Sequence, residues 1–333
     1  MMGNKLWNCY DILYWYLLKK LTRFKEKNLR FHKYIKAVGT GAKGNRDLEE
    51  NEIIDAINMI LNKEATDSQV GAFLVAWRTK LETNDELKAM VKALKTYVKT
   101  KKVPDSIELG YSFDGRVRNP FLFPLYENIL KEFYSSNPEV KRLNIVISGD
   151  LVQPAKKGLT AKDIFDEMKE CEYLHFFDRK EYFEKLSDFT QLRHELGLRT
   201  AFNTVEKLLN PGLSQYAITT AFHKPYVKKY IEIFNEYYDD IFVIKASEGS
   251  PEVFKNGKYW KLIDGEIKDF SFDLSEYGIE TPQEYENISK QEALEIINNP
   301  DQNTINLAKF NIAILLYLTN RIESLDEAWQ KIK

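Results

Sequence analysis

Two loops that combine glycine with polar residues could bind an anion. Residues 110–115 read Gly-Tyr-Ser-Phe-Asp-Gly and follow a short strand-like run at 107–109. A second loop runs from 148 to 158, after an apolar run at 143–147. Backbone N–H groups in such loops can hold a phosphate or a carboxylate. Because the carboxyl ends of parallel strands meet at one edge of a sheet, we expect both loops to border one crevice. A structural turn explains residues 110–115 equally well.

Two carboxylates late in the chain could bind a divalent cation. Glu248 and Glu252 follow the apolar run 241–244, which is where a parallel sheet places its ligands. Carboxylate oxygens are ligands that magnesium prefers, and two of them in one loop indicate a candidate metal site.

Residues 191–203 mix Arg, Asn and Gly with apolar side chains. This mixture suits a buried polar crevice better than a plain amphipathic helix. An equally weighted alternative is that Arg199 and Asn203 only cap and brace the local backbone. Both interpretations stay open at this point.

Two familiar site patterns carry little weight. Residues 39–44 match G-x-G-x-x-G, but a dinucleotide site needs a strand before that motif and a second parallel strand within about 30 residues. Helical patterns follow here, so we interpret the motif as a flexible basic loop, with phosphate contact by Lys43 and Arg46 as a minor alternative. The histidines lack metal-ligand spacing and a neighbouring nucleophile, which argues against a zinc site or a serine-type triad. They are His32, His175, His194 and His223.

Residues 47–100 are expected to form three helices. Each begins with a capping residue and has Glu or Gln three positions later, a pairing that satisfies free N–H groups at a helix start. The pairs are Asp47 with Glu50, Thr66 with Gln69, and Thr83 with Glu86. Apolar residues follow at helical spacing. We therefore predict a basic extension over 1–46 and a helical domain over 47–104.

The pattern changes over residues 105–333. Apolar runs at 143–147, 216–219 and 241–244 alternate with amphipathic stretches such as 226–238. This alternation is typical of a mainly parallel sheet covered by helices. The predicted fold class is α/β, with a small N-terminal helical domain and a larger α/β domain around a mainly parallel central sheet. Part of 175–200 is a candidate to pack with the helical domain.

Local signals place further elements. Asn256-Gly257 predicts a hairpin turn, Pro120 predicts the start of a helix, and Thr160 with Asp163 predicts another helix start. Apolar periodicity predicts helices near 303–319 and from 324.

The charge of the chain is unevenly distributed. It has 333 residues, with 48 Lys+Arg, 50 Asp+Glu and a formal net charge of −2. The first 46 residues nevertheless contain eleven basic and two acidic residues. Aromatic residues interleave with this positive charge, namely Trp15, Tyr16, Phe24, Phe31 and Tyr34. Such a segment could bind nucleic acid by phosphate attraction and base stacking, although packing of these rings onto the helical domain is the preferred interpretation.

Composition excludes several protein classes. A hydrophobic content of 44% with 29% charged residues argues against global disorder. Cys9 and Cys171 are too far apart to suggest a disulfide framework. The apolar segment 12–18 is far shorter than the about 20 residues of a spanning helix. We expect a cytoplasmic protein with no membrane partner.

Together these pieces resemble glycosyltransferase family 3, to which the anthranilate phosphoribosyltransferases belong. Residues 66–83 look like the family's amino-terminal helical domain. Residues 196–203 with Asn210-Pro211 are similar to its most recognisable internal motif, and 311–317 looks like its carboxyl-terminal helix. The resemblance runs in order over about residues 33 to 333. It implies a nucleoside phosphorylase/phosphoribosyltransferase-like fold.

The resemblance also implies a reaction. In the family, phosphoribosyl pyrophosphate lies between the helical and sheet domains, with a glycine-rich loop and magnesium on its phosphates. An amine attacks the anomeric carbon of the ribose as pyrophosphate departs. This chemistry depends on backbone amides, cations and metal rather than on a covalent nucleophile, so no catalytic residue is assigned.

Several positions of the family pattern differ in this chain. The family's Gly-Thr-Gly-Gly-Asp-Gly loop falls on residues 110–115, with Ser112 and Phe113 in place of the two central glycines. The family's Lys-His-Gly-Asn segment falls on residues 147–150, which read Ile-Ser-Gly-Asp and lack both cationic residues. Its Asp-Glu pair for magnesium falls on Pro251-Glu252, where only the Glu is kept.

The site residues expected from the resemblance fall into three groups. Those for the donor phosphates are Gly110, Asp114, Gly115, Ser148, Gly149 and Lys156. Those for the acceptor are Arg193 and Asn203, and those for Mg²⁺ are Glu248 and Glu252. The resemblance thus implies transfer of a phosphoribosyl group from phosphoribosyl pyrophosphate, or use of a related phosphorylated sugar, by a homodimer that pairs through its helical domain. The alternative is an inactive relative that binds nucleic acid through residues 1–46.

Overall fold

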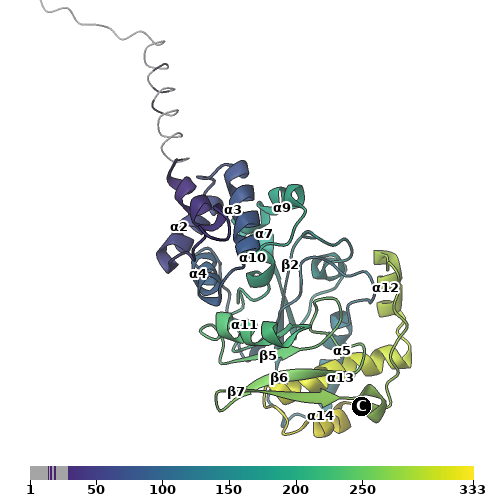
Figure 1. The fold of residues 1–333 in the computed structure, drawn as a ribbon. Coiled ribbons are helices and arrows are strands. Elements are labelled where there is room, and N and C mark those ends of the chain that lie inside the picture. The colour runs from purple at the N-terminus through teal and green to yellow at the C-terminus, as the bar shows by residue number, and fades with distance from the viewer. Residues whose placement is uncertain (1–13, 15, 17–18, 20–28) are drawn as a thin grey trace, which may run out of the picture. The chain divides into compact units, whose positions relative to one another are not determined.

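The computed structural model describes residues 14, 16, 19 and 29–333. They fall into two compact units that divide after residue 89. Figure 1 shows the elements of both units along the chain.

The described part of the first unit is helical. Residues 29–39 form a helix, and α2 (Glu50–Leu61), α3 (Asp67–Lys80) and the start of α4 (Asn84–Lys95) follow. The Phe73 ring of α3 lies 5.5 Å, between centroids, from Phe31 of the 29–39 helix and 5.3 Å from Trp77 of its own helix. All three side chains are buried. Burial of these large rings contributes to the stability of this unit.

Two predicted helix starts in this unit are confirmed. The Thr66 hydroxyl accepts a hydrogen bond from the Gln69 N–H at 3.3 Å. The Thr83 hydroxyl accepts one from the Glu86 N–H at 3.1 Å. Both pairs satisfy N–H groups that the first helical turn leaves free.

The predicted start of the first helix at Asp47 is wrong. Glu49 caps α2 and pairs reciprocally with Glu52. The Asp47 carboxylate instead forms an ion pair with Lys80 at the end of α3. Asp47 therefore contacts a residue of another helix, α3, instead of capping α2.

The aromatic residues of the basic segment differ in their surroundings. Phe31 and Tyr34 are buried in the first unit, so their rings are not available to stack on bases. Tyr16 is 61% exposed. Trp15 and Phe24 lie outside the described residues. Binding of nucleic acid by this segment stays a prediction.

A seven-stranded sheet forms the centre of the second unit, in the order β3-β2-β1-β4-β5-β6-β7. Five strands are parallel: β1 (Ser106–Leu109), β2 (Asn144–Gly149), β3 (Leu174–Asp178), β4 (Tyr216–Thr220) and β5 (Asp240–Ile244). The antiparallel strands β6 (Gly257–Ile263) and β7 (Glu266–Phe272) complete the sheet. The α/β fold class with a mainly parallel sheet is thus confirmed.

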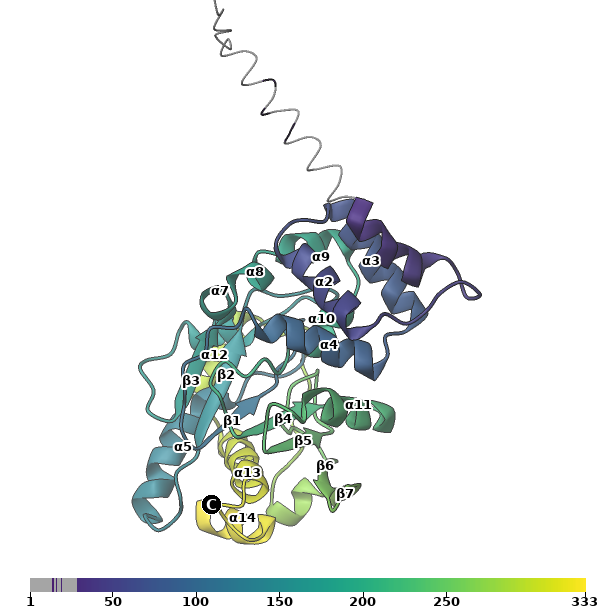
Figure 2. The ribbon, with the colours of Figure 1, turned by 90° about the vertical axis from the view of Figure 1, so that its left-hand side faces the viewer.

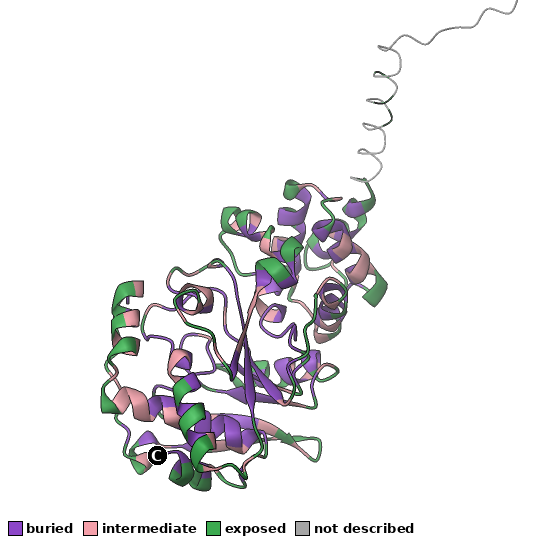
Figure 3. Cartoon of the chain, turned by 180° about the vertical axis from the view of Figure 1, so that it is seen from behind, coloured by how far each residue is buried: buried purple, intermediate pink, exposed green. Residues whose placement is uncertain are grey.

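Helices cover the sheet and bury its apolar side chains. Figures 1 and 2 show α5 (Phe123–Ser136) beside the long helix α13 (Gln302–Leu318), and both contribute to one hydrophobic core. The other elements of this unit are α6 (Ala161–Phe165), α7 (Arg179–Tyr182), α8 (Glu184–Ser187), α9 (Thr190–Leu196), α10 (Ala201–Val205), α11 (Lys224–Phe234), a 3₁₀ turn (Leu274–Tyr277), α12 (Lys290–Asn298) and α14 (Leu325–Ile332). Figure 3 shows the central strands as buried. Near-continuous apolar strands are expected where helices cover both faces of a parallel sheet.

Two predicted local signals are wrong in position. The hairpin turn lies at Asp264-Gly265, between β6 and β7, because both residues adopt the positive φ values that this turn needs. Asn256 instead accepts a hydrogen bond from the Leu274 N–H through its side chain, at 2.9 Å. Helix α5 begins at Phe123, with Pro124 rather than Pro120 in its first turn.

No helix among the described residues is long and apolar enough to span a membrane.

Candidate functional site

The loops that follow β1 and β2 are joined to one another. The Gln153 N–H donates to the Phe113 carbonyl at 2.7 Å. Arg116 and Leu159 exchange backbone hydrogen bonds of 2.8 and 2.9 Å. The structure therefore brings together loops 110–116 and 150–159 at the carboxyl edge of the sheet.

The glycines of these loops allow chain segments to pack closely. A Cβ at Gly158 would lie 2.1 Å from the Arg116 carbonyl oxygen, so the exchange between the two loops requires glycine there. A Cβ at Gly110 would lie 2.9 Å from Leu208, and one at Gly149 would lie 2.7 Å from Phe176. The protein's own atoms occupy the space beside each glycine.

Aromatic side chains fill the first loop from within. Tyr111 and Phe113 are 3% and 4% exposed. The Tyr111 ring packs against Phe121 and Phe123. The Phe113 ring lies 4.4 Å from the Arg179 guanidinium carbon. Loop 110–115 therefore owes its shape to packed rings, which a chain of glycines could not provide.

Polar residues of the 191–203 region contact both loops. The Asp114 carboxylate forms an ion pair with Arg199. Asn203 donates to the Pro154 carbonyl at 2.9 Å and accepts from the Thr200 N–H at 3.0 Å. Thus Arg199 pairs with loop 110–115 and Asn203 with loop 150–159. The structural alternative expected local contacts, and of these three only the cap of the Thr200 N–H by Asn203 is local.

Glu248 lies in a cradle of backbone N–H groups. Its two carboxylate oxygens accept hydrogen bonds of 2.8 to 3.1 Å from the N–H groups of Val117, Arg118 and Asn119. The Arg116 Nε lies 3.8 Å away. Hydrogen bonds between carboxylates and backbone N–H groups are among the stronger ones in proteins.

Glu252 clamps the start of α5. One carboxylate oxygen accepts from the N–H groups of Leu122 and Phe123, each at 2.9 Å, and the other forms an ion pair with Arg116. Both Glu252 and Arg116 are 1% exposed. The Phe254 ring lies 5.0 Å from the Arg116 guanidinium carbon. A buried charge pair with further hydrogen bonds and aromatic cover is a strong structural restraint.

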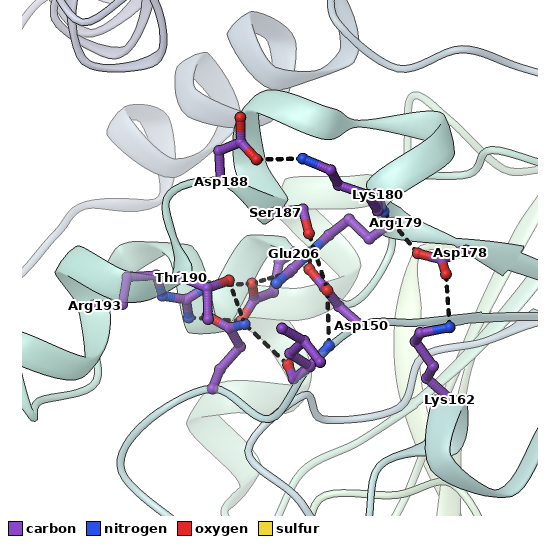
Figure 4. Close-up of polar contacts among 12 residues, drawn as sticks. Asp150, Lys162, Asp178, Arg179, Lys180, Ser187, Asp188, Thr190, Arg193 and Glu206 are labelled. Atoms are coloured by element: carbon purple, nitrogen blue, oxygen red, sulfur yellow. Dashed lines mark hydrogen bonds and ion pairs between the residues drawn. The ribbon is translucent and has the colours of Figure 1, made fainter. Parts of the chain in front are cut away.

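Figure 4 shows a second cluster of buried charges, which includes Asp150 at the start of the second loop. Glu206 accepts hydrogen bonds from Arg193 at 2.6 and 2.8 Å and from Arg179 at 2.5 Å. Arg179 also pairs with Asp150, which accepts from the Ser187 hydroxyl at 3.0 Å. These charged side chains are at most 3% exposed. Arg193 is therefore engaged inside the protein.

Lys156 differs from the other predicted site residues because its ammonium remains available. Its side chain is half-buried on loop 150–159. Within residues 29–333 it has no ion-pair partner. The neighbouring Lys157 is exposed, and Ser148 is buried at the end of β2.

Sequence reasoning missed Arg116, Arg179 and Glu206. The only local signal was the position of Arg116 directly after the loop at 110–115. Glu206 lies between the two parts of the recognised motif, residues 196–203 and Asn210-Pro211, and nothing in the sequence around it indicates its two arginine partners.

Comparison with known proteins identifies the family of this chain. The helical bundle domain of the glycosyl transferase family matches residues 32–97, and the a/b domain of that family matches residues 159–333. An uncharacterized protein of Aquifex aeolicus is 30% identical over 327 residues, which cover 95% of this chain and 96% of that protein. The chain belongs to this glycosyl transferase family.

More distant family members carry a named activity. The anthranilate phosphoribosyltransferase of Petrotoga mobilis is 27% identical over 330 residues, covering 89% of this chain and 90% of that protein. That of Saccharolobus islandicus is 23% identical over 305 residues, covering 86% and 87%. The glycosyl transferase assignment makes this chain a phosphoribosyltransferase-like member of an enzyme family.

Solved structures agree on the fold. The anthranilate phosphoribosyltransferase of Thermus thermophilus superposes with a TM-score of 0.69 at 15% identity, over 91% of this chain and 92% of that one. The enzyme of Saccharomyces cerevisiae in complex with PRPP and Mg gives a TM-score of 0.71 at 15% identity over the same shares. The two-domain architecture of the glycosyl transferase family is thereby confirmed.

The magnesium ligands predicted for this glycosyl transferase family member do not fit a metal ion in the structure. The carboxylate oxygens of Glu248 and Glu252 accept hydrogen bonds from backbone N–H groups and from Arg116. Across the described residues there is no group of three or more His, Cys, Asp or Glu side chains that could hold a metal ion. Residues 116–123 thus already satisfy both carboxylates in this structure, and magnesium binding by these two residues stays a prediction.

We expect the folding stability of this glycosyl transferase family member to depend on pH through one buried carboxyl group. Burial raises the pKa of Glu108, on β1, to about 7, although the Tyr238 hydroxyl, Lys95 and the Asn210 N–H oppose this rise. A carboxyl whose pKa is higher in the folded than in the unfolded protein costs stability as it ionises. That cost begins above its ordinary pKa of 4.5 and is complete above about 7.

We expect Glu108→Gln to remove this pH dependence. Between pH 4.5 and 8 the wild type should lose about 3 kcal/mol of unfolding free energy relative to the variant, from a shift of some 2.5 pKa units at 1.36 kcal/mol each. Urea denaturation of both proteins across this pH range measures the difference. Parallel curves for the two proteins would show that Glu108 stays in one protonation state.

Proposed function

We propose that this chain transfers a phosphoribosyl group from phosphoribosyl pyrophosphate to an amine acceptor. The observation that carries the proposal is its relation, over nearly the full length of both chains, to anthranilate phosphoribosyltransferases. The S. cerevisiae member has been solved with PRPP and Mg. The joined loops at the carboxyl edge of the parallel strands support the same location for a ligand.

In the proposed reaction the amine nitrogen bonds to the anomeric carbon as the bond from that carbon to pyrophosphate breaks. The departing pyrophosphate takes the bonding electrons, and the amine loses a proton. The protein must hold the phosphates and stabilise the charge that develops on them. We assign this work to the Lys156 ammonium and to backbone N–H groups of loop 148–158. The N–H groups of Gly110, Tyr111 and Ser112 already donate to backbone carbonyls.

Arg193 and Asn203 act in this proposal as positioning residues. Asn203 holds the Pro154 carbonyl and so orients the loop that carries Lys156. Arg193 fixes Glu206, which holds Arg179 against the Phe113 ring. Neither side chain has to leave its partners to serve the reaction. Homodimer formation and a place in tryptophan biosynthesis remain proposals from the family relation alone.

Lys156→Met tests the proposal. Loss of one charged hydrogen bond to a phosphate costs about 1.5–3 kcal/mol, so affinity for phosphoribosyl pyrophosphate should fall about 10- to 100-fold. Isothermal titration calorimetry on the full-length protein measures this change. The matched control is Lys157→Met, one residue away and exposed, which should change the affinity less than about threefold.

Two results would count against the proposal. If wild-type protein binds no phosphoribosyl pyrophosphate at millimolar concentration, the donor is wrong. If Lys156→Met and Lys157→Met weaken binding equally, the attraction is a general surface effect and Lys156 has no specific role.

A further inference from the structure

A cavity of about 290 Å³ lies where α12 ends and α13 begins, within the second unit. Figure 1 labels both helices. We call it the α13 cavity. Its apolar wall includes Leu122, Phe254 and Leu307, which are at most 4% exposed. Its volume is at the lower end of the range for ligand pockets, which suits a molecule of one or two rings.

The rim of the α13 cavity is polar and carries a single negative charge. Gln283, Asn299 and Asp301 are exposed lining residues. The structure describes every lining residue, and none of them is Lys, Arg or His. Hydrogen bonding to Thr304 lowers the pKa of Asp301, so this side chain is ionised at neutral pH. The rim therefore offers hydrogen-bond acceptors and repels anions.

The wall nearest the carboxyl edge is fixed before any ligand binds. Asn119 lines the cavity, its N–H donates to Glu248, and its side-chain amide donates to the Ser247 hydroxyl, both at 3.1 Å. The Leu122 N–H donates to Glu252. A preformed wall spares a ligand the cost of ordering it.

Another part of the lining belongs to a strap of residues 280–288 that is anchored at both ends. Glu280 and Asn303 exchange two hydrogen bonds of 2.9 Å. The Tyr285 N–H donates to the Arg118 carbonyl at 2.9 Å, and the Ile288 N–H donates to the Val117 carbonyl at 2.7 Å. The Tyr285 ring, 41% exposed, therefore stands on a fixed backbone at the cavity rim.

We propose that the α13 cavity binds a flat aromatic molecule that carries N–H donors and no negative charge, such as a nucleobase or an aromatic amide. The Phe254 and Tyr285 rings supply aromatic surface for a planar ring. The carboxylate of Asp301 and the side-chain carbonyls of Gln283 and Asn299 supply acceptors for its N–H groups. This site is separate from the proposed donor site and does not depend on it.

Three probes of one shape and different charge test the proposal. Benzamidine is cationic, benzamide is neutral and benzoate is anionic. We expect benzamide and benzamidine to bind the full-length protein with a Kd on the order of 1 mM and to compete with each other. Benzoate should bind at least about tenfold more weakly, because the rim is acidic. Saturation-transfer NMR and calorimetric titration measure these affinities, and equal binding of all three probes would overturn the proposal.

Two variants locate the site. Thr304→Trp places a large ring at a half-buried lining position and should abolish binding of both probes. Asp301→Asn keeps a helix-capping side chain and should weaken benzamidine about threefold while leaving benzamide unchanged. The matched control is Asp273→Asn, which alters another capping carboxylate outside the cavity. If Thr304→Trp does not fold, an unchanged affinity of Asp301→Asn for benzamidine still refutes the assignment.

Discussion

Replacing Glu206 with alanine should lower the free energy of unfolding by about 3–5 kcal/mol or more, the cost of leaving buried charge without a partner. Glu206 is 1% exposed and is bonded to Arg193 and Arg179. Arg179 would keep Asp150, but Arg193 would lose both of its hydrogen bonds to a carboxylate. Guanidinium chloride denaturation of the wild type and the variant measures the loss.

The control for Glu206→Ala is a variant of a solvent-exposed ion pair in the same unit. Glu172 pairs with Arg142 at 2.9 Å, and its side chain is 52% exposed. Glu172→Ala should therefore cost less than about 1 kcal/mol. If the two variants lose equal stability, burial does not determine the contribution of the cluster in Figure 4.

Acid should weaken the same cluster. Burial by itself would raise the pKa of Glu206, but the charges of Arg193 and Arg179 outweigh it and hold the pKa below its usual 4.5. A group of this kind adds stability above its unfolded pKa, and this stability disappears as the pH falls through its folded pKa. The difference between the wild type and Glu206→Gln should thus be constant from pH 5 to 7 and shrink below 4.5. This is the opposite direction from Glu108.

Local sequence signals predicted much of the fold because their partners are close in the chain. The cap of Thr66 by Gln69 and the cap of Thr160 by Asp163 each span three residues. The strands were recognisable because parallel strands covered on both faces are nearly continuous apolar runs. β3 was missed, since it reads Leu-His-Phe-Phe-Asp and lies at an edge of the sheet, where four of its five residues are only half-buried.

The candidate site was harder to predict because its interactions join distant residues. Arg116 and Glu252 are separated by 136 positions, and Val117 and Glu248 by 131. A carboxylate in a loop after a strand fits a metal site or a backbone clamp equally well in sequence. Only the geometry distinguishes them, through the N–H groups of residues 117–123.

Glu252→Ala separates a clamp from a metal ligand, and it is the second change with a large expected effect. It removes the hydrogen-bonded partner of the buried Arg116 guanidinium, which keeps only a longer contact of 3.8 Å with Glu248. It also removes the acceptor of the Leu122 and Phe123 N–H groups. We expect a loss of about 3–5 kcal/mol in the free energy of unfolding. Denaturation in EDTA and in magnesium should give the same loss. A metal ligand would instead cost stability only when magnesium is present.

The double variant Arg116→Met/Glu252→Ala decides whether that loss comes from the unpaired charge. Removing both partners takes away the buried charge together with its partner, so the double variant should be more stable than Glu252→Ala alone. A control is Glu284→Ala, on the strap of residues 280–288. It breaks the exposed ion pair between Glu284 and Arg118 and should cost less than about 1 kcal/mol. If the double variant is instead less stable than Glu252→Ala, the clamp acts mainly through the N–H groups at the start of α5. The guanidinium then contributes by packing between the Phe121 and Phe254 rings rather than by its charge.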